Sequence, residues 1–201
     1  MNYLAHTFLS HESDAAIVGA LLGDFVKGPL GEGYPPAIRD AIRLHRAIDR
    51  YTDQHEIVTT SRVRVSRARR RFAGILVDVF YDHFLAVNWN RFCATPLEVF
   101  TARVYTALQP QIATYPQRLQ TVLPHMTRED WLASYAQIDS VDAALNGIAR
   151  RFNRFARARV LEDAVQELTD NYAALESDFL AFFPELVKFA HGCQGYAQRV
   201  A

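Results

Sequence analysis

Apolar residues recur at spacings of three and four along most of the chain, a pattern typical of helices that bury one face. The clearest stripe is formed by Val141, Leu145, Ile148, Phe152 and Phe155. A second stripe is formed by Leu97, Phe100, Val104, Leu108 and Ile112. No run of strictly alternating residues between Asn-Gly or Asp-Gly turns predicts a strand. The pattern therefore predicts a chain built of helices.

Cap and turn residues indicate where these helices begin and end. Helix starts are indicated at Ser13-Asp14, at Pro35-Pro36, at Thr127 with Asp130, and at Asp139 or Ser140. Pro29 with Gly28, Gly31 and Gly33 predicts an early loop. About eight helices are expected, at 1–10, 14–27, 36–53, 60–92, 96–114, 116–124, 128–157 with a break near Asp139, and 160–190. Short connections leave them only one another to pack against, which predicts an all-α irregular helical bundle.

Length and composition bound the class of protein. The 201 residues are 50% apolar, which is enough for one sizeable core and predicts a single domain over 1–201. The two cysteines, Cys93 and Cys193, lie outside any metal or redox spacing, which favours a reducing compartment and hence a cytoplasmic location. Neither a leader pattern nor a long apolar run is found, so secretion and membrane association are not expected.

Net charge is zero, but the arginines are concentrated in two short segments. The first comprises Arg62, Arg64, Arg67, Arg69, Arg70 and Arg71. The second comprises Arg150, Arg151, Arg154, Arg157 and Arg159. Such surfaces suit an acidic protein partner, and a solvated helix face is the alternative. Nucleic acid is not an expected partner, because the chain is neutral overall and carries no recognition motif.

Two segments combine acids with histidines at helical spacing. His45, Asp49 and Asp53 are each four residues apart and would share one helix face. Asp78 and Asp82, the latter followed by His83, are also four apart. This second segment is apolar nearly all round, so the helix is expected to be buried.

Buried carboxylates require a counter-charge, because an ionised carboxylate without a partner costs several kcal/mol in a protein interior. A divalent cation is one such partner, and mixed carboxylate and imidazole ligands suit Mn, Fe or Zn, or Mg when histidines are few. Asp24, inside an apolar segment, adds a further acid. Structural ion pairs with arginines such as Arg43, Arg46 or Arg50 are the alternative. No nucleophile elbow, phosphate-binding glycine loop or Cys-x-x-Cys supports covalent or nucleotide chemistry.

Four segments in the first ninety residues together resemble the acyl carrier protein phosphodiesterases, also called holo-acyl carrier protein hydrolases. They are Met1 to His6, Gly19 to Gly28 (GALLGDFVKG), Leu44 to His55 (LHRAIDRYTDQH) and Asp78 to Trp89 (DVFYDHFLAVNW). The resemblance implies a metal-dependent hydrolase that removes the 4′-phosphopantetheine arm from the serine of holo-acyl carrier protein. It favours Mn²⁺ as the metal, with Mg²⁺ or Fe²⁺ as alternatives.

The same resemblance implies a distant, HD-like relationship to helical phosphohydrolases. In that superfamily the adjacent ligand pair reads His-Asp, whereas here it reads Asp82-His83, so which residues are ligands stays open. The expected metal ligands are Asp24, Asp78, Asp82 and His83, with His45 next. Asp49 is expected to orient His45 or act as a base, and His6 or His55 to protonate the leaving serine oxygen. Arg46 is expected to hold a phosphate oxygen, and Arg62 to Arg71 to bind the acidic carrier protein.

Two other functions fit the same residues. An HD-like nucleotide phosphohydrolase would keep the chemistry and change the substrate. A non-catalytic helical module would bind an acidic protein through its arginines and use the histidines and aspartates as buried ion pairs.

Overall fold

A computed structural model of the chain describes residues 1–152, 161 and 163–200, without the side chains of 151, 152 and 194–200. Every regular element among these residues is a helix, as the spacing predicts. The α-helices are α1 (Tyr3–Phe8), α2 (Asp14–Leu22), α3 (Pro36–Gln54), α4 (Glu56–Arg64), α5 (Ala73–Val87), α6 (Leu97–Leu108), α7 (Gln117–Arg128), α8 (Trp131–Ser134), α9 (Ile138–Phe152), α10 (Val165–Asp170) and α11 (Tyr172–Val200). The 3-10 helices are η1 (Arg70–Phe72), η2 (Trp89–Arg91) and η3 (Ile112–Thr114).

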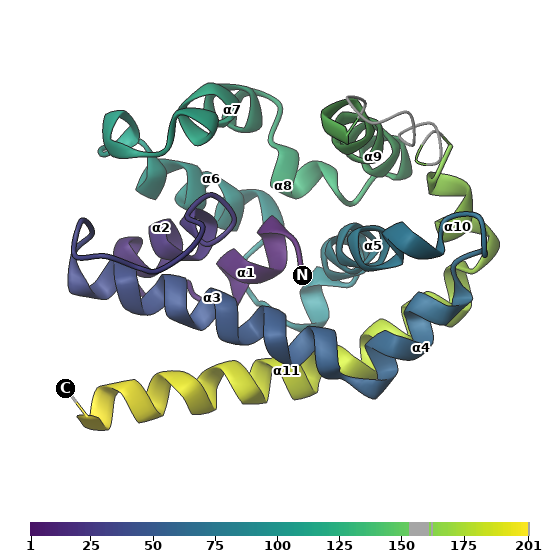
Figure 1. Ribbon diagram of the computed structural model, residues 1–201, viewed down its shortest axis with the longest axis horizontal. Helices are drawn as coiled ribbons and strands as arrows, with labels where there is room; N and C mark the ends of the chain where they lie inside the picture. Colours follow the sequence, from purple (N-terminus) through teal and green to yellow (C-terminus); the bar gives the residue numbers. More distant parts are fainter. Residues whose placement is uncertain (153–160, 162, 201) are drawn as a thin grey trace.

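The helices surround α1 and α5, which lie in the middle of the view in Figure 1. Helix α11 runs along one side and packs against α3, α4 and α5, while α6 to α9 lie across the opposite side. The buried apolar side chains form one continuous core. Its largest members, from α5 and α11, include Phe80, Tyr81, Phe84, Phe179, Phe182 and Phe183. Burial of α5 on nearly all sides agrees with its apolar sequence.

Several predicted boundaries are confirmed by their cap geometry. The Ser13 hydroxyl accepts from the Ala16 N–H at the start of α2, and Pro36 is the first residue of α3. The predicted glycine loop lies between these two helices. Gly28 has a positive φ of 78°, a conformation that a side chain would oppose.

One predicted helix, 60–92, is wrong because tertiary contacts break it where the sequence has neither proline nor glycine. Helix α4 ends at Arg64, and the extended residue Val65 is fully buried. The Arg70 guanidinium donates to the carbonyls of Val63 and Val65, while the Glu167 carboxylate accepts from the Ser66 N–H at 2.9 Å. Side chains therefore satisfy backbone groups that a continuous helix would have paired internally.

The later boundaries also differ from the predictions. Thr127 does not begin a helix: α7 continues to Arg128, and Asp130, at φ 41°, caps α8 instead. Helix α9 begins at Ile138, so Asp139 lies in its first turn. The predicted 160–190 helix is divided at Asn171 into α10 and α11. Within the described residues, no helix combines the length and apolar character that crossing a membrane would require.

Candidate metal centre

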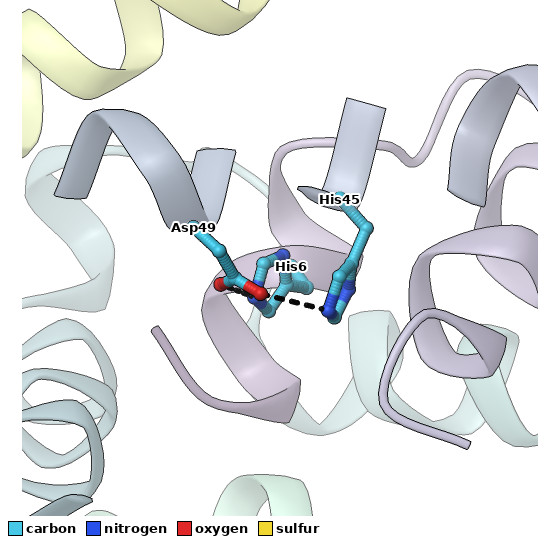
Figure 2. A group of neighbouring side chains, drawn as sticks. All are labelled: His6, His45 and Asp49. Carbon is cyan, nitrogen blue, oxygen red and sulfur yellow. Dashed lines mark hydrogen bonds and ion pairs between the residues drawn. The ribbon is translucent and has the colours of Figure 1, made fainter. Parts of the chain in front are cut away.

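Three side chains from two helices meet beside the core: His6 from α1, and His45 and Asp49 from α3 (Figure 2). The Asp49 carboxylate lies 3.0 Å from His6 Nε2 through one oxygen and 3.2 Å from His45 Nε2 through the other. The two imidazole rings stack at 3.6 Å between centroids. His45 and Asp49 share a helix face, as their spacing predicts, but His6 joins them only through the tertiary fold.

The hydrogen bond on the far side of His45 determines which of its nitrogens is available. Its Nδ1 lies 2.7 Å from the Ala20 carbonyl, which can only accept, so Nδ1 carries the proton. In the neutral ring, Nε2 then presents a lone pair to the Asp49 carboxylate. His45 Nε2 and the Asp49 oxygen, two acceptors 3.2 Å apart, repel each other unless both bind the same proton or the same metal cation. Metal-binding histidines usually donate one ring N–H to a carbonyl or carboxylate, which leaves the second ring nitrogen to bind the metal. His45 has this arrangement, with its second nitrogen beside the Asp49 carboxylate.

His6 is held in its neutral form. Burial, and next the neighbouring His45, lower its pKa to about 3. Its Nδ1 is buried without a hydrogen-bond partner among the described residues. The nitrogen that faces Asp49 is Nε2, and a neutral ring with its proton on Nδ1 can offer Nε2 to a metal, because metals bind the unprotonated nitrogen.

Asp49 supplies the negative charge of the group. Burial alone would raise its pKa, but hydrogen bonds from His45 and His6, donated when their Nε2 atoms carry protons, hold that pKa well below its ordinary value, so the carboxylate is ionised. Its side chain is 42% exposed, whereas His6 and His45 are almost fully buried. The group therefore opens to solvent on the Asp49 side, where a substrate can approach.

Gly19 in α2 and Gly23 at its C-cap allow α3 to approach closely enough to build this group. A methyl group at Gly23 would overlap the ring of His45, and one at Gly19 would overlap Ala41 and the Ile38 carbonyl. Sequence reasoning missed both roles. Their spacing of four residues, which places both on one helix face, was the available signal.

Asp78 and Asp82, expected as metal ligands, interact with the start of the chain and of α1. Asp78 accepts from the amino group of Met1 at 2.9 Å, and that amino group lies 3.7 Å from Asp49. Asp82 is fully buried and accepts from the backbone N–H groups of Leu4 and Ala5, at 2.8 and 3.0 Å. Because Asn2 makes no side-chain cap, Asp82 acts as the cap of α1 from another helix. It thereby fixes the helix that carries His6.

Asp82→Ala is expected to lower the free energy of unfolding by about 1–3 kcal/mol, because two buried N–H groups would lose their acceptor. Chemical denaturation measures this, with the exposed Asp40→Ala as the control.

Burial raises the pKa of Asp82 to about 7, so the folded protein retains a proton that the unfolded chain releases near pH 4. The stability advantage of wild type over Asp82→Ala should therefore shrink as pH rises from about 4 to about 7. An advantage that grows over this range would contradict the assignment.

Of the remaining expected ligands, Asp24 interacts with the centre and His83 does not. Asp24 is half-buried and interacts electrostatically with His45 and Asp49, and burial raises its pKa. His83 is directed elsewhere: Nδ1 lies 2.8 Å from the Tyr135 carbonyl and Nε2 lies 2.9 Å from the Tyr172 hydroxyl. Both of its nitrogens thus have partners, so the structure groups His6, His45 and Asp49 where the sequence favoured Asp24, Asp78, Asp82 and His83.

Arg46 and His55 also have partners away from the three residues. The Arg46 guanidinium donates to the Val26 carbonyl at 2.9 Å and ties the glycine loop to α3. His55 accepts from the Ile57 N–H as the cap of α4, and its Nε2 lies 3.4 Å from Glu185. Phosphate binding by Arg46 and proton transfer by His55 would both require these contacts to change.

Most arginines of the first cluster are engaged within the molecule. Arg62 pairs with Asp53, Arg64 with Asp178 and Arg69 with Glu167, and Arg70 donates to backbone carbonyls. Arg67 and Arg71 are exposed and form no ion pair with any residue that the structure describes. In the second cluster, Arg154, Arg157, Arg159 and the Arg151 side chain lie outside the described residues.

Comparison with known proteins gives one consistent result. The sequence profile of the family described as "Acyl carrier protein phosphodiesterase" matches residues 1–186. Relatives named acyl carrier protein phosphodiesterase include one from Klebsiella pneumoniae, 34% identical over 96% of this chain and 100% of the relative. Others are from Photorhabdus laumondii, 32% identical over 98% of both chains, and Escherichia coli, 35% identical over 94% of this chain and 97% of the relative. No solved structure matches.

Proposed function

Because this chain belongs to the acyl carrier protein phosphodiesterase family, we propose that it hydrolyses the phosphodiester that joins 4′-phosphopantetheine to the serine of holo-acyl carrier protein. The products are apo-acyl carrier protein and 4′-phosphopantetheine. The meeting of His6, His45 and Asp49 at a solvent opening is the observation that carries this proposal, because phosphodiester hydrolysis requires neutralisation of phosphoryl charge.

We propose that His6, His45 and Asp49 hold a divalent cation. Two imidazoles with one carboxylate suit Mn²⁺ or Fe²⁺ better than Mg²⁺, which prefers oxygen ligands, and Mn²⁺ is the proposed ion. When bound, such an ion neutralises charge on the phosphoryl oxygens and makes water a stronger acid. The two nitrogens that face Asp49, Nε2 of His6 at 3.0 Å and Nε2 of His45 at 3.2 Å, support this assignment.

The protein's own residues orient the reaction and supply its protons. The Ala20 carbonyl and Asp82 hold His45 and α1 in place, so the centre is preorganised. In the reaction, a water oxygen bonds to phosphorus, the water loses one proton to the solvent, and the bond to the serine oxygen breaks. The serine oxygen then takes up a proton. Asp24 is the proposed donor, because burial raises its pKa and it interacts with both His45 and Asp49.

The direct test is incubation of holo-acyl carrier protein with the protein and Mn²⁺, followed by mass spectrometry. We expect the carrier protein to lose the mass of the phosphopantetheinyl group and to gain one hydrogen on its serine oxygen. Incubation with a chelator is the control and should leave the mass unchanged. An unchanged carrier protein in the presence of Mn²⁺ would exclude this substrate.

We propose that Arg67 and Arg71 attract the acidic carrier protein, because the other arginines of their cluster are held in internal contacts. Replacing both with Glu should lower kcat/KM for holo-acyl carrier protein by about tenfold at low ionic strength, and less as salt is added. The matched control is Arg43→Glu, an exposed arginine outside the cluster. Equal losses in the two variants, or a loss that salt does not reduce, would contradict the proposal.

The proposed compartment is the cytoplasm. Cys93 and Cys193 are both free thiols, as proteins of reducing compartments usually have.

A further inference from the structure

A cavity of about 860 Å³ lies next to the candidate metal centre. It is lined by α1, the loop after α2, α5 and the segment from α7 to α9. Asp24 connects the two sites, because it lines the cavity and also interacts with His45 and Asp49. Helix α1 connects them as well: Tyr3, its first residue, lines the cavity and His6 belongs to the metal centre. A cavity of this size suits a drug-sized molecule.

Two rings and a cation form one wall of this cavity. Tyr3 stacks on Phe25 at 6.2 Å between centroids, and the Arg118 guanidinium lies 5.5 Å from the centre of the Phe25 ring. Arg118 is exposed and forms no ion pair with any described residue. The wall is therefore apolar, with a cation at its outer end, where an acidic surface could pair with it.

The other lining residues mix apolar and hydroxyl groups with the amide of Asn2 and the charged groups of Glu129 and Arg150. Ile75, Ala144 and Ile148 supply apolar surface. Ser140 supplies a hydroxyl that can donate or accept, and the Ser134 hydroxyl, which donates to the Trp131 carbonyl, can accept. A ligand for such a lining would have short apolar stretches between uncharged hydrogen-bonding groups. Pantetheine has this composition, because two amides and a hydroxyl are separated by methylene and methyl groups.

We propose that this cavity holds the pantetheine arm of the substrate, with its phosphate end at Asp24 and the metal centre and its thiol end towards Trp131. This inference rests on the proposed function for its choice of ligand. Lys27, which also lines the cavity near Asp24, adds a positive charge at the phosphate end. The carrier protein, which is joined to the phosphate end of the arm, stays outside, beside Arg118.

The fluorescence of Trp131 can report this binding. Of its two tryptophans, Trp131 lines the cavity, while Trp89 is buried and donates to the Thr95 carbonyl. Free pantetheine, titrated into the metal-free protein, is expected to change tryptophan fluorescence in a saturable way. The change should be absent in Trp131→Phe. A wild-type titration without saturation would overturn the proposal.

A second variant locates the binding within the cavity. Ala144→Phe should weaken pantetheine binding about tenfold or more by filling the cavity, while Val99→Phe, on the exposed face of α6, should not change it. Thermal unfolding checks that both variants are folded, and equal affinity in folded Ala144→Phe and wild type would overturn the proposal. Since the titration needs neither metal nor turnover, saturable binding without hydrolysis of holo-acyl carrier protein would refute the proposed function and leave this site in place.

Discussion

Asp49→Asn is expected to abolish Mn²⁺-dependent release of phosphopantetheine while the protein remains folded. Asp49 contacts both histidines and is the only carboxylate in the group of three. The amide that replaces it has no charge and is a poor metal ligand. Loss of a partner that merely orients a ligand typically costs 10–100-fold in metal affinity, so loss of a ligand should lower kcat/KM by more than about 100-fold. Isothermal titration with Mn²⁺ and the mass-spectrometric assay measure the two effects.

The matched control is Asp53→Asn, one turn further along α3. Its carboxylate is exposed and pairs with Arg62 at 2.5 Å, so its removal should leave Mn²⁺ binding unchanged. Full Mn²⁺-dependent activity in Asp49→Asn would show that the metal lies elsewhere. Asp24, which sits beside the centre, would then be the next acid to replace.

Gly23→Ala is expected to lower the stability of the protein and its Mn²⁺ affinity together. The added methyl would occupy the position of the His45 ring, so either the ring or α3 must move. Inserting a methyl into a packed interior usually costs about 1–3 kcal/mol of stability. Here it should also displace a proposed ligand, and Mn²⁺ affinity should fall at least about 10-fold, as when a ligand loses its orientation.

Gly31→Ala provides the control for this substitution. Gly31 has open space around it and no positive φ, so alanine there should leave stability and Mn²⁺ binding nearly unchanged. Chemical denaturation and Mn²⁺ titration of both variants test the comparison. If Gly23→Ala binds Mn²⁺ as wild type does, His45 is not held by this contact.

The helical framework follows from local sequence. Periodic apolar residues, Ser13 as a cap and Pro36 as a first helical residue each act within a few positions, and each prediction is confirmed. The spacing of His45 and Asp49 correctly predicts that they share one helix face, because residues four apart in a helix are neighbours. Motifs in the first ninety residues were also sufficient to identify the family, since they combine four short segments whose order and spacing can be read directly.

The grouping of the site was decided by tertiary contacts. Nothing near His6 in sequence indicates that it stacks on His45, and nothing near Asp82 indicates that it caps α1. Burial made a partner necessary for both Asp78 and Asp82. The Met1 amino group pairs with Asp78, whereas Asp82 accepts from two backbone N–H groups and retains a proton up to a pKa of about 7. Spacing reveals which residues share a face of one helix. Only the packing of separate helices determines which faces meet, because that depends on close approaches such as Gly23 against His45.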